Sequence, residues 1–360
     1  GRRILEAALF FERLDLTGPE SCGSFLGSSW MRMQCSFGVG GAVPASVLSG
    51  FAWMQPIKSH LIACNLPPSL ASGMAAYPVQ VLVDMLAEDG SFLEPLRLDL
   101  CIAPQAEKEP VGAVLCTEPL HDLHAGRAVF NLVRHHLQVG FSVDLYDSDG
   151  SGAAAHRLLK HTGRVQYFPR FIQYQFSTKL GQQEAAEIGV PASGCSVGMQ
   201  EIHCLFRHRG RSRWVVPRLD PDEYFYAPGR GNVSLSNLLT RLEEEGVRHL
   251  RIPSLEFGGA PSANQTHIVT ERFFLSSGVL NPHWMVLSDP SHTMSSHTHS
   301  ARPRPGAHWN RVFQDEGGAR LRVHHYLHMF GERYVPFISA ERQNFHVEDR
   351  SMLERLQEEP

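Results

Sequence analysis

The chain has 360 residues, and its 33 basic and 37 acidic residues leave a formal net charge of -4. No basic run is long enough to make nucleic acid a main partner, and no apolar run reaches the roughly 18 residues that a membrane helix needs. The length predicts one large domain and one smaller domain. Because the chain begins with Gly1, we expect any natural membrane anchor to lie upstream of it.

Residues 1–110 predict a small β-rich domain. Helical periodicity is weak there, and segments 60–64 and 77–83 have strand character between Gly and Pro residues. Two roles are open for this domain: packing support for the rest of the chain, or a carbohydrate-binding module that positions an acceptor.

Residues 111–330 predict an α/β domain, because strands alternate with helices. The expected strands are 111–116, 141–146, 164–168, 214–219 and 248–252, and the expected helices are 125–137, 153–161, 197–206 and 235–245. This alternation predicts a mostly parallel sheet flanked by helices on both faces.

The remainder of the chain has less pattern. Residues 288–308 are rich in Ser, His, Pro and Arg, which is typical of a mobile loop that covers a site. Residues 331–360 form a predicted C-terminal extension with a helix at 348–358.

The seven cysteines have no C-x-x-C spacing, so a zinc knuckle is not expected. Sequons at Asn232 and Asn264 permit N-glycosylation and favour a secretory location weakly.

The acidic motif formed by Asp220, Pro221, Asp222 and Glu223 directly follows a predicted buried strand. In open α/β sheets, ligands bind outside the carboxyl ends of the strands. Two carboxylates there can hold Mn²⁺ or Mg²⁺ and, through the cation, a diphosphate. We therefore predict that Asp220 and Asp222 bind a metal; the alternative is a solvated acidic turn.

A second acidic segment contains Asp147 and Asp149, after the strand at 141–146. We predict that these residues lie near the base or ribose of a nucleotide. The alternative is a polar loop in which an Asp caps the next helix. A calcium loop is excluded, because its twelfth position would be Leu158 where a Glu is needed.

The chain has 20 histidines, and nine of them lie at or after residue 283. One of His297, His299 and His325 is expected to complete the metal site, with His299 and His325 as the chosen candidates. The arginines at 207, 209, 211 and 213 permit two interpretations: groups that steer a diphosphate, or a solvated helix end. A serine-hydrolase elbow at Ser196 is rejected, because no strand precedes it.

Ordered short motifs in this chain resemble those of glycosyltransferase family 92, over roughly residues 58–330. The segments that carry the resemblance are 60–67, 114–120, 135–147, 200–205, 213–215, 220–224, 257–258, 271–273 and 325–326. The sequence departs from the family at Pro221, where an apolar residue is usual, and over 277–302.

The resemblance implies a GT-A fold, in which a Rossmann-like nucleotide-binding half is merged with an acceptor-binding half. It also implies Mn²⁺ dependence and transfer of galactose from UDP-galactose, with inversion, to a glycan or glycoprotein. The implied location is the Golgi or secretory lumen, as a type II membrane protein. In such a protein Asp220 and Asp222 would hold the metal, and Asp147 would lie near the nucleotide.

Single displacement needs a general base, for which the candidates are Glu256, Glu271 and Asp289. Two other functions remain open at this point. One is a catalytically inactive carbohydrate-binding or scaffold protein, which the departures at Pro221 and 277–302 favour. The other is a metal-dependent hydrolase that uses the histidines, although no H-x-x-x-H spacing on a clear helix supports it.

Overall fold

The computed structural model describes the residue ranges 4–11, 32–36, 42–51, 58–65, 79–86, 96–100, 111–120, 126–169, 194–227, 235–259, 270, 273, 275–297, 299–303, 311–314, 321–327, 345 and 347–349. The chain divides into two compact units, one comprising 1–107 and 174–199 and the other 108–173 and 200–360. The first division lies close to the boundary that we predicted at 110. The second segment of the first unit was not predicted.

The first unit contains a six-stranded antiparallel sheet with the order β1-β4-β3-β2-β5-β6. Its strands are β1 (Ile4–Phe11), β2 (Arg32–Ser36), β3 (Ala42–Phe51), β4 (Lys58–Asn65), β5 (Val79–Leu86) and β6 (Leu96–Leu100). The predicted β-rich character of this part of the chain is therefore confirmed.

The second unit is built on a ten-stranded mixed sheet. Its strands are β7 (Val111–Thr117), β8 (Ser142–Tyr146), β9 (Val165–Phe168), β10 (Ser212–Leu219), β11 (Glu223–Tyr226), β12 (Val247–Gly258), β13 (Leu275–Ser288), β16 (Arg311–Gln314), β17 (Arg322–Tyr326) and β18 (Val347–Glu348). Its helices are α2 (Gly126–Val139), α3 (Ala153–Leu159), the 3-10 helix η1 (Lys160–Thr162), α5 (Gly194–His208, which starts in the first unit) and α6 (Leu235–Glu244).

The main path of the sheet has the order β11-β17-β12-β13-β10-β7-β8-β9. Strands β10, β7, β8 and β9 are mutually parallel neighbours, whereas β13 runs antiparallel to both β10 and β12. The chain moves outwards from β7 to β8 and β9, and then returns to place β10 on the other side of β7. The strand order therefore reverses between β7 and β10, which is where open α/β sheets bind ligands.

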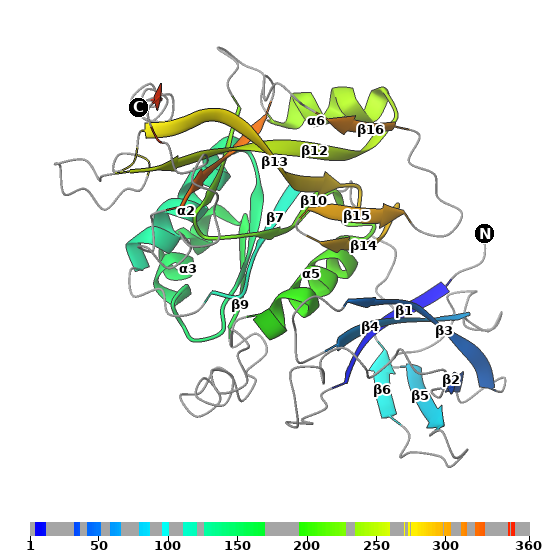
Figure 1. The fold of residues 1–360 in the computed structure, drawn as a ribbon. Helices are drawn as coiled ribbons and strands as arrows, with labels where there is room; N and C mark the ends of the chain where they lie inside the picture. The colour runs from blue at the N-terminus through cyan, green and yellow to red at the C-terminus, as the bar shows by residue number, and fades with distance from the viewer. Residues whose placement is uncertain are drawn as a thin grey trace, which may run out of the picture. The chain divides into compact units, whose positions relative to one another are not determined.

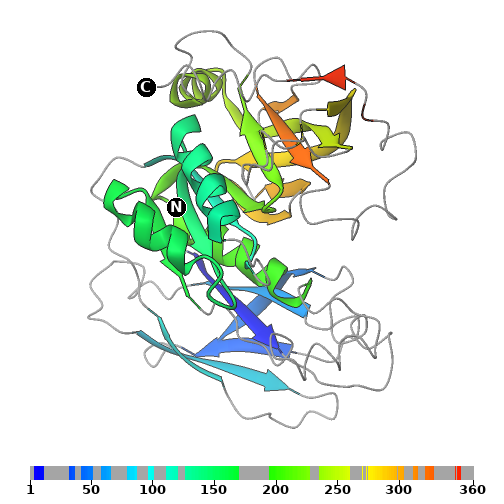
Figure 2. The same ribbon diagram turned by 90° about the vertical axis from the view of Figure 1, so that its left-hand side faces the viewer.

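Helices cover both faces of this sheet, as predicted. The larger core lies on the α2 face, where Leu132 and Val133 of α2 and Leu239 of α6 belong to the same buried cluster as the facing strands. A smaller cluster on the α5 face joins Cys204 and Leu205 to the strands. Figure 1 shows α2 and α3 on one side of the parallel strands and α5 on the other, and Figure 2 turns α2 and α3 towards the viewer.

The helix ends follow local chemistry. Helix α6 presents its leucines to the core and is followed by Gly246, whose φ of 77° is the left-handed conformation that glycine adopts easily. Within the described part of the chain, each helix is too short or too polar to serve as a membrane span.

Two predictions near the C-terminus are wrong. The segment expected to be a loop at 288–308 instead begins with the end of β13 and forms a hairpin of β14 (Thr293–His297) and β15 (Ser300–Pro303). The Thr293 hydroxyl donates to the carbonyl of Asp289 at 2.7 Å and helps to fix the start of this hairpin. The helix predicted to begin at 348 also fails at its start, because Val347 and Glu348 form β18; the rest of it lies outside the described residues.

Candidate active site

Two acidic segments meet at the point where the strand order reverses. Glu118 directly follows β7, and Asp220 directly follows β10. The backbone N–H of Glu118 donates to the carbonyl of Leu219 at 2.9 Å, so the two strand ends are tied together. The topology thus places both carboxylates at the carboxyl edge of the parallel strands, as we expected for Asp220.

A tight turn carries the acidic motif from β10 into β11. The N–H of Glu223 donates to the carbonyl of Asp220 at 3.1 Å, and the N–H of Asp220 donates to the Glu223 carboxylate at 3.0 Å. Pro221 occupies the second position of this four-residue turn, where its fixed φ is favourable. The unusual proline therefore has a local structural reason.

The turn brings the motif against β17. Glu223 is paired with His325 across the antiparallel β11–β17 ladder. The Nε2 atom of His325 lies 3.4 Å from Oδ2 of Asp222, and the N–H of Tyr326 donates to the carbonyl of Asp222 at 2.8 Å. The structure therefore brings together Asp220, Asp222 and His325, which were three of the four predicted metal ligands.

Arg218 is the main cation at this position. Its Nε donates to Oδ1 of Asp220 at 2.8 Å and its Nη2 to Oδ2 at 3.1 Å, which forms a two-point ion pair. The same Nη2 lies 3.3 Å from a Glu118 carboxylate oxygen. Arginine is well suited to such a fork, and it fixes the orientation of Asp220. We call the group of Glu118, Arg218, Asp220, Asp222, Glu223 and His325 the acidic cluster.

The acidic cluster contains more carboxyl groups than cationic partners. Burial and then the charge of Asp220 raise the pKa of Glu223 to about 8, and the same two causes raise the pKa of Glu118 well above its ordinary value. Burial opposes the charge of His325, but Asp222 and its acidic neighbours still raise the pKa of this histidine to about 9. The raised pKa values of these three groups are consistent with crowded negative charge at the carboxyl end of the parallel strands.

The donor set suits a hard divalent cation. Asp222 and Asp220 offer carboxylate oxygens, with side chains 10% and 31% exposed, and His325 offers an imidazole. The buried Nδ1 of His325 has no hydrogen-bond partner within the described structure. Mg²⁺ and Mn²⁺ prefer oxygen ligands and accept an occasional imidazole, so the residue types suit the predicted metal. However, no three ligand atoms of the acidic cluster lie within 4.8 Å of one another in the described structure, and Arg218 already holds both oxygens of Asp220.

The second acidic segment has a structural role in this fold. Oδ1 of Asp147 accepts the N–H groups of Asp149 and Gly150, and Oδ2 accepts the N–H of Gly152 and the hydroxyl of Tyr167, at distances from 2.7 to 3.1 Å. Asp147 is fully buried, so these contacts correspond to the loop-capping alternative. Asp149 is exposed and accepts the N–H of Ser151. Their role beside a nucleotide stays a prediction.

The three candidate bases lie in different places. Glu256 pairs in register with His325 across β12 and β17, but it is only 1% exposed and its carboxylate accepts the amide of Asn281 at 2.7 Å. This contact makes Glu256 a positioning residue between β12 and β13 rather than a group open to an acceptor. Glu271 lies outside the described residues and stays a prediction.

Asp289 lies at the opposite edge of the sheet. It follows Ser288, which pairs with Val215 in the middle of β10. Asp220 lies five residues after Val215 along the strand direction, which corresponds to roughly 17 Å. The carboxylate of Asp289 contacts Arg248 and His292 instead, so the described contacts do not place it beside the acidic cluster.

The remaining predicted histidines do not join the acidic cluster in the described contacts. His299 lies at the connection between β14 and β15, in a separate two-stranded sheet. The side chain of His297 lies outside the described residues. Of the two whose side chains are described, His299 and His325, it is His325 that lies against Asp222.

The four arginines near the end of α5 have separate partners or none. Arg207 pairs with Asp144, Arg213 with Glu243, and Arg209 donates to two backbone carbonyls. They precede or begin β10, whereas the acidic cluster lies beyond its carboxyl end. They are therefore too remote to steer a diphosphate at Asp220.

Within the described part of the chain, the group of three potential ligands whose atoms do lie within 4.8 Å of one another is Cys116, Asp144 and His208. Cys116 is joined to Cys204 by a disulfide, so it offers no thiolate. This group is therefore not a cysteine–histidine zinc site.

Sequence reasoning missed Glu118 and Arg218. Glu118 had a signal similar to that of Asp220, because it lies two residues after the strand predicted at 111–116. Arg218 gave no comparable signal, since an arginine near the end of a buried strand is identified as an ion-pair partner only when the neighbouring strand is known.

Comparisons with known proteins add little to this geometry. No family model matches the chain, and no curated protein matches it significantly in sequence. Among solved structures, a crystal structure of residues 1–349 of TarS from S. aureus overlaps 66% of this chain and 67% of its own, with 12% identity and a TM-score of 0.32. An overlap with so low a TM-score carries no argument about fold or function.

Proposed function

We propose that this protein is a metal-dependent glycosyltransferase with a GT-A fold, which moves a sugar from a nucleotide donor to a glycan hydroxyl. We further propose that the donor is UDP-galactose and that galactose is transferred with inversion at its anomeric carbon. The observation that supports it best is the meeting of Glu118, Asp220 and Asp222 at the reversal point between β7 and β10.

The cation would be held by Asp220 and Asp222, with His325 beside them, and would neutralise the charge on the departing diphosphate. Arg218 fixes the Asp220 carboxylate through its two-point contact. The bond from the anomeric carbon to the diphosphate oxygen breaks as the bond to the acceptor oxygen forms. The acceptor proton passes to a carboxylate base, for which Glu271 is the remaining candidate.

A secretory location belongs to the same proposal. The disulfide between Cys116 and Cys204 lies in the α/β unit, two residues before Glu118. Disulfides persist in oxidising compartments and are rare in the cytosol, so the bond supports the Golgi or secretory lumen as the site of action.

One contact favours the alternative of an inactive carbohydrate-binding or scaffold protein. Because Arg218 already pairs with both oxygens of Asp220, it supplies positive charge where a metal-dependent enzyme would use a cation. The alternative predicts glycan binding without Mn²⁺ binding or UDP release.

The test measures Mn²⁺ binding directly, from the paramagnetic resonance signal of free Mn²⁺, and UDP release from UDP-galactose. The variant is Asp222→Asn, which keeps the shape of the side chain and removes its charge. We expect at least a tenfold loss of Mn²⁺ affinity, or about 1.4 kcal/mol, and a larger loss of turnover. The matched control is Glu244→Gln, because Glu244 is an exposed carboxylate on α6.

Equal Mn²⁺ binding by wild type and Asp222→Asn would remove the metal assignment. Arg218→Met separates the two functions. If the protein is an enzyme, this variant loses turnover because Asp220 is no longer oriented; if Arg218 has replaced the cation, the variant gains Mn²⁺ binding that the wild type lacks.

A further inference from the structure

Arg218 has carboxylate neighbours on more than one strand at the carboxyl end of β10. It forms the two-point ion pair with Asp220, at 2.8 and 3.1 Å. Its Nη2 also lies 3.3 Å from a carboxylate oxygen of Glu118, which follows β7. The Arg218 side chain is 20% exposed, so it is not fixed by close packing on every side. The guanidinium group therefore has a second carboxylate within reach while it is paired with Asp220.

Helix α5 brings a third carboxylate, Glu201, to the same place. Nε2 of Gln200 donates to the carbonyl of Pro217 at 2.8 Å, which holds this turn of α5 against the residue before Arg218. Glu201 is the next residue along the helix and is only 2% exposed. Oε1 of Gln200 is buried and has no hydrogen-bond partner among the described residues. This turn of α5 thus offers a buried carboxylate and an unused acceptor beside Arg218.

The three carboxylates act together on the charge of Arg218. Burial lowers the pKa of Arg218, but Asp220, Glu118 and Glu201, in that order, raise it above its ordinary value. An arginine stays protonated in all such surroundings. Arg218 can therefore pair with Asp220, or with Glu118 and Glu201, without any change of protonation.

A divalent cation held by Asp220 and Asp222 would share the Asp220 carboxylate with the guanidinium group. Two positive groups on one carboxylate repel each other, and they do so more strongly in a partly buried site than in water. With Arg218 on Asp220, no three ligand atoms of the acidic cluster lie within 4.8 Å of one another among the described residues. The observed position of Arg218 therefore opposes the binding of a cation at Asp220.

We infer that Arg218 is a positioning residue with two alternative sets of partners, Asp220 on one side and Glu118 with Glu201 on the other. When a divalent cation binds, the guanidinium group leaves Asp220 and pairs with Glu118 and Glu201. This exchange leaves both oxygens of Asp220 to the cation and keeps the buried carboxylates neutralised. The inference rests on the proposed metal site, and it adds that Arg218 competes with the metal for Asp220.

The test measures the Mn²⁺ affinity of the full chain from the paramagnetic resonance signal of free Mn²⁺, so it does not depend on turnover. Arg218→Met is expected to bind Mn²⁺ at least about tenfold more tightly than the wild type, because Asp220 loses its competing partner and is left as an uncompensated charge. Arg218→Lys keeps the charge but loses the fork, so its affinity is expected to lie between the two. An arginine that only oriented Asp220 for the metal would produce the opposite result, a loss of affinity in both variants.

Glu201→Gln separates the exchange of partners from a long-range effect of charge. In the wild-type background this substitution should weaken Mn²⁺ binding about threefold or more, because Arg218 loses a partner to which it can move. In the Arg218→Met background the same substitution should have little effect, since no guanidinium group has to move. A long-range effect of charge would weaken Mn²⁺ binding equally in both backgrounds.

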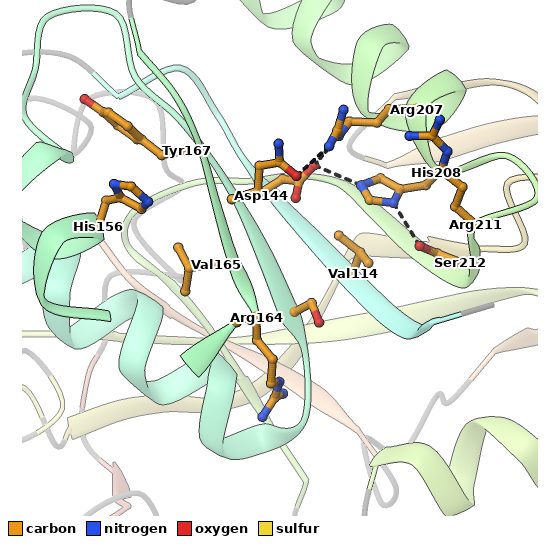
Figure 3. A pocket seen from close by; sticks show the side chains of 13 residues that line it. Val114, Asp144, His156, Arg164, Val165, Tyr167, Arg207, His208, Arg211 and Ser212 are labelled. Carbon is orange, nitrogen blue, oxygen red and sulfur yellow. Dashed lines mark hydrogen bonds and ion pairs between the residues drawn. The ribbon is translucent and has the colours of Figure 1, made fainter. Parts of the chain in front are cut away.

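Arg207→Met is the matched control. The side chain of Arg207 is 26% exposed and lies 3.3 Å from Asp144, so this arginine is also a partly buried member of an ion pair. Figure 3 shows Asp144 in contact with both Arg207 and His208, so the carboxylate keeps a partner when Arg207 is replaced. Because this ion pair lies outside the acidic cluster, the Mn²⁺ affinity of Arg207→Met should equal that of the wild type.

The inference is overturned if Arg218→Met binds Mn²⁺ no more tightly than the wild type, or if Arg207→Met gains as much affinity. It is also overturned if Glu201→Gln has the same effect in both backgrounds. If Asp222→Asn loses Mn²⁺ binding while Arg218→Met gains none, the proposed metal site stands and the exchange does not. Binding by Arg218→Met but not by the wild type would mean that Arg218 never leaves Asp220, which overturns the exchange and favours the inactive alternative. Binding by neither protein would overturn both the exchange and the metal site.

Discussion

Removal of the Cys116–Cys204 disulfide should destabilise the α/β unit strongly. The bond joins the end of β7 to α5, and both cysteines are fully buried in the cluster on the α5 face. Cys116 lies two residues before Glu118, so the bond also fixes the strand end that carries part of the acidic cluster. Alanine at both positions breaks the bond while leaving small apolar groups in the core.

The magnitude follows from the length of the closed loop. The cysteines are 88 residues apart, for which the chain-entropy model gives about 4.6 kcal/mol near room temperature. Measured losses on removing native disulfides commonly fall at about 2 to 5 kcal/mol. We therefore expect the free energy of unfolding to fall by about 3 to 5 kcal/mol in Cys116→Ala/Cys204→Ala.

The assay is urea unfolding without reductant, followed by tryptophan fluorescence, since Trp214 is fully buried in β10. Each single alanine variant breaks the same bond, so each should lose nearly as much stability as the double variant. A loss below about 1 kcal/mol in the double variant, or strictly additive losses in the two single variants, would refute the reasoning.

Three further predictions test the reading of individual residues. Asp147→Asn should lower the free energy of unfolding by about 1.5 to 3 kcal/mol, because charged acceptors of backbone N–H groups are lost. Urea unfolding measures this loss. Weakened UDP binding with unchanged stability would instead indicate that Asp147 binds the nucleotide. Gly246→Ala should cost about 1 kcal/mol, because a Cβ is strained at its positive φ, and a neutral result in thermal unfolding would contradict the helix-end assignment. Burial and then the charge of His135 hold the pKa of His136 well below its ordinary 6.5, so the unfolded chain takes up a proton first as pH falls. The free energy of unfolding should thus fall by about 1.4 kcal/mol for each pH unit below about 6.5 because of His136. Urea unfolding at several pH values should show that this free energy depends less steeply on pH in His136→Gln than in the wild type. An identical pH dependence in the two proteins would exclude a buried neutral ring.

The sequence predicted most of the α/β unit because its signals there are local. The helices around Leu132 and Leu239 show clear apolar faces, and short buried strands alternate with them. Each expected strand and helix between 111 and 252 corresponds to an observed element. The helix predicted at 235–245 is confirmed as α6, which ends shortly before Gly246 with its positive φ.

Elements beyond residue 270 were harder to predict because their stability depends on strand pairing. Strand β13 runs between β10 and β12, and β17 between β11 and β12. Polar residues such as Thr293 and His325 then acquire partners that no local pattern indicates. The hairpin of β14 and β15 was mistaken for a loop for the same reason.

The site was only partly predictable. Asp220 and Asp222 follow from strand-end position, which is a local signal. The placement of His325 beside Asp222 depends on the return of a distant strand, so the sequence could offer only a choice among histidines. Asp147 and Asp289 have the same residue type and a similar strand-end position, and only their contacts show that they hold loops.

The disulfide also changes what a break in the chain would do. Residues 174–199 belong to the first unit, and they lie entirely within the stretch of chain between Cys116 and Cys204 that the disulfide closes into a loop. A protease that cuts once between the two cysteines would leave two fragments that remain covalently joined. On a denaturing gel the nicked protein would keep its full mass until a thiol reductant released the fragments, which makes limited proteolysis a simple readout of this bond.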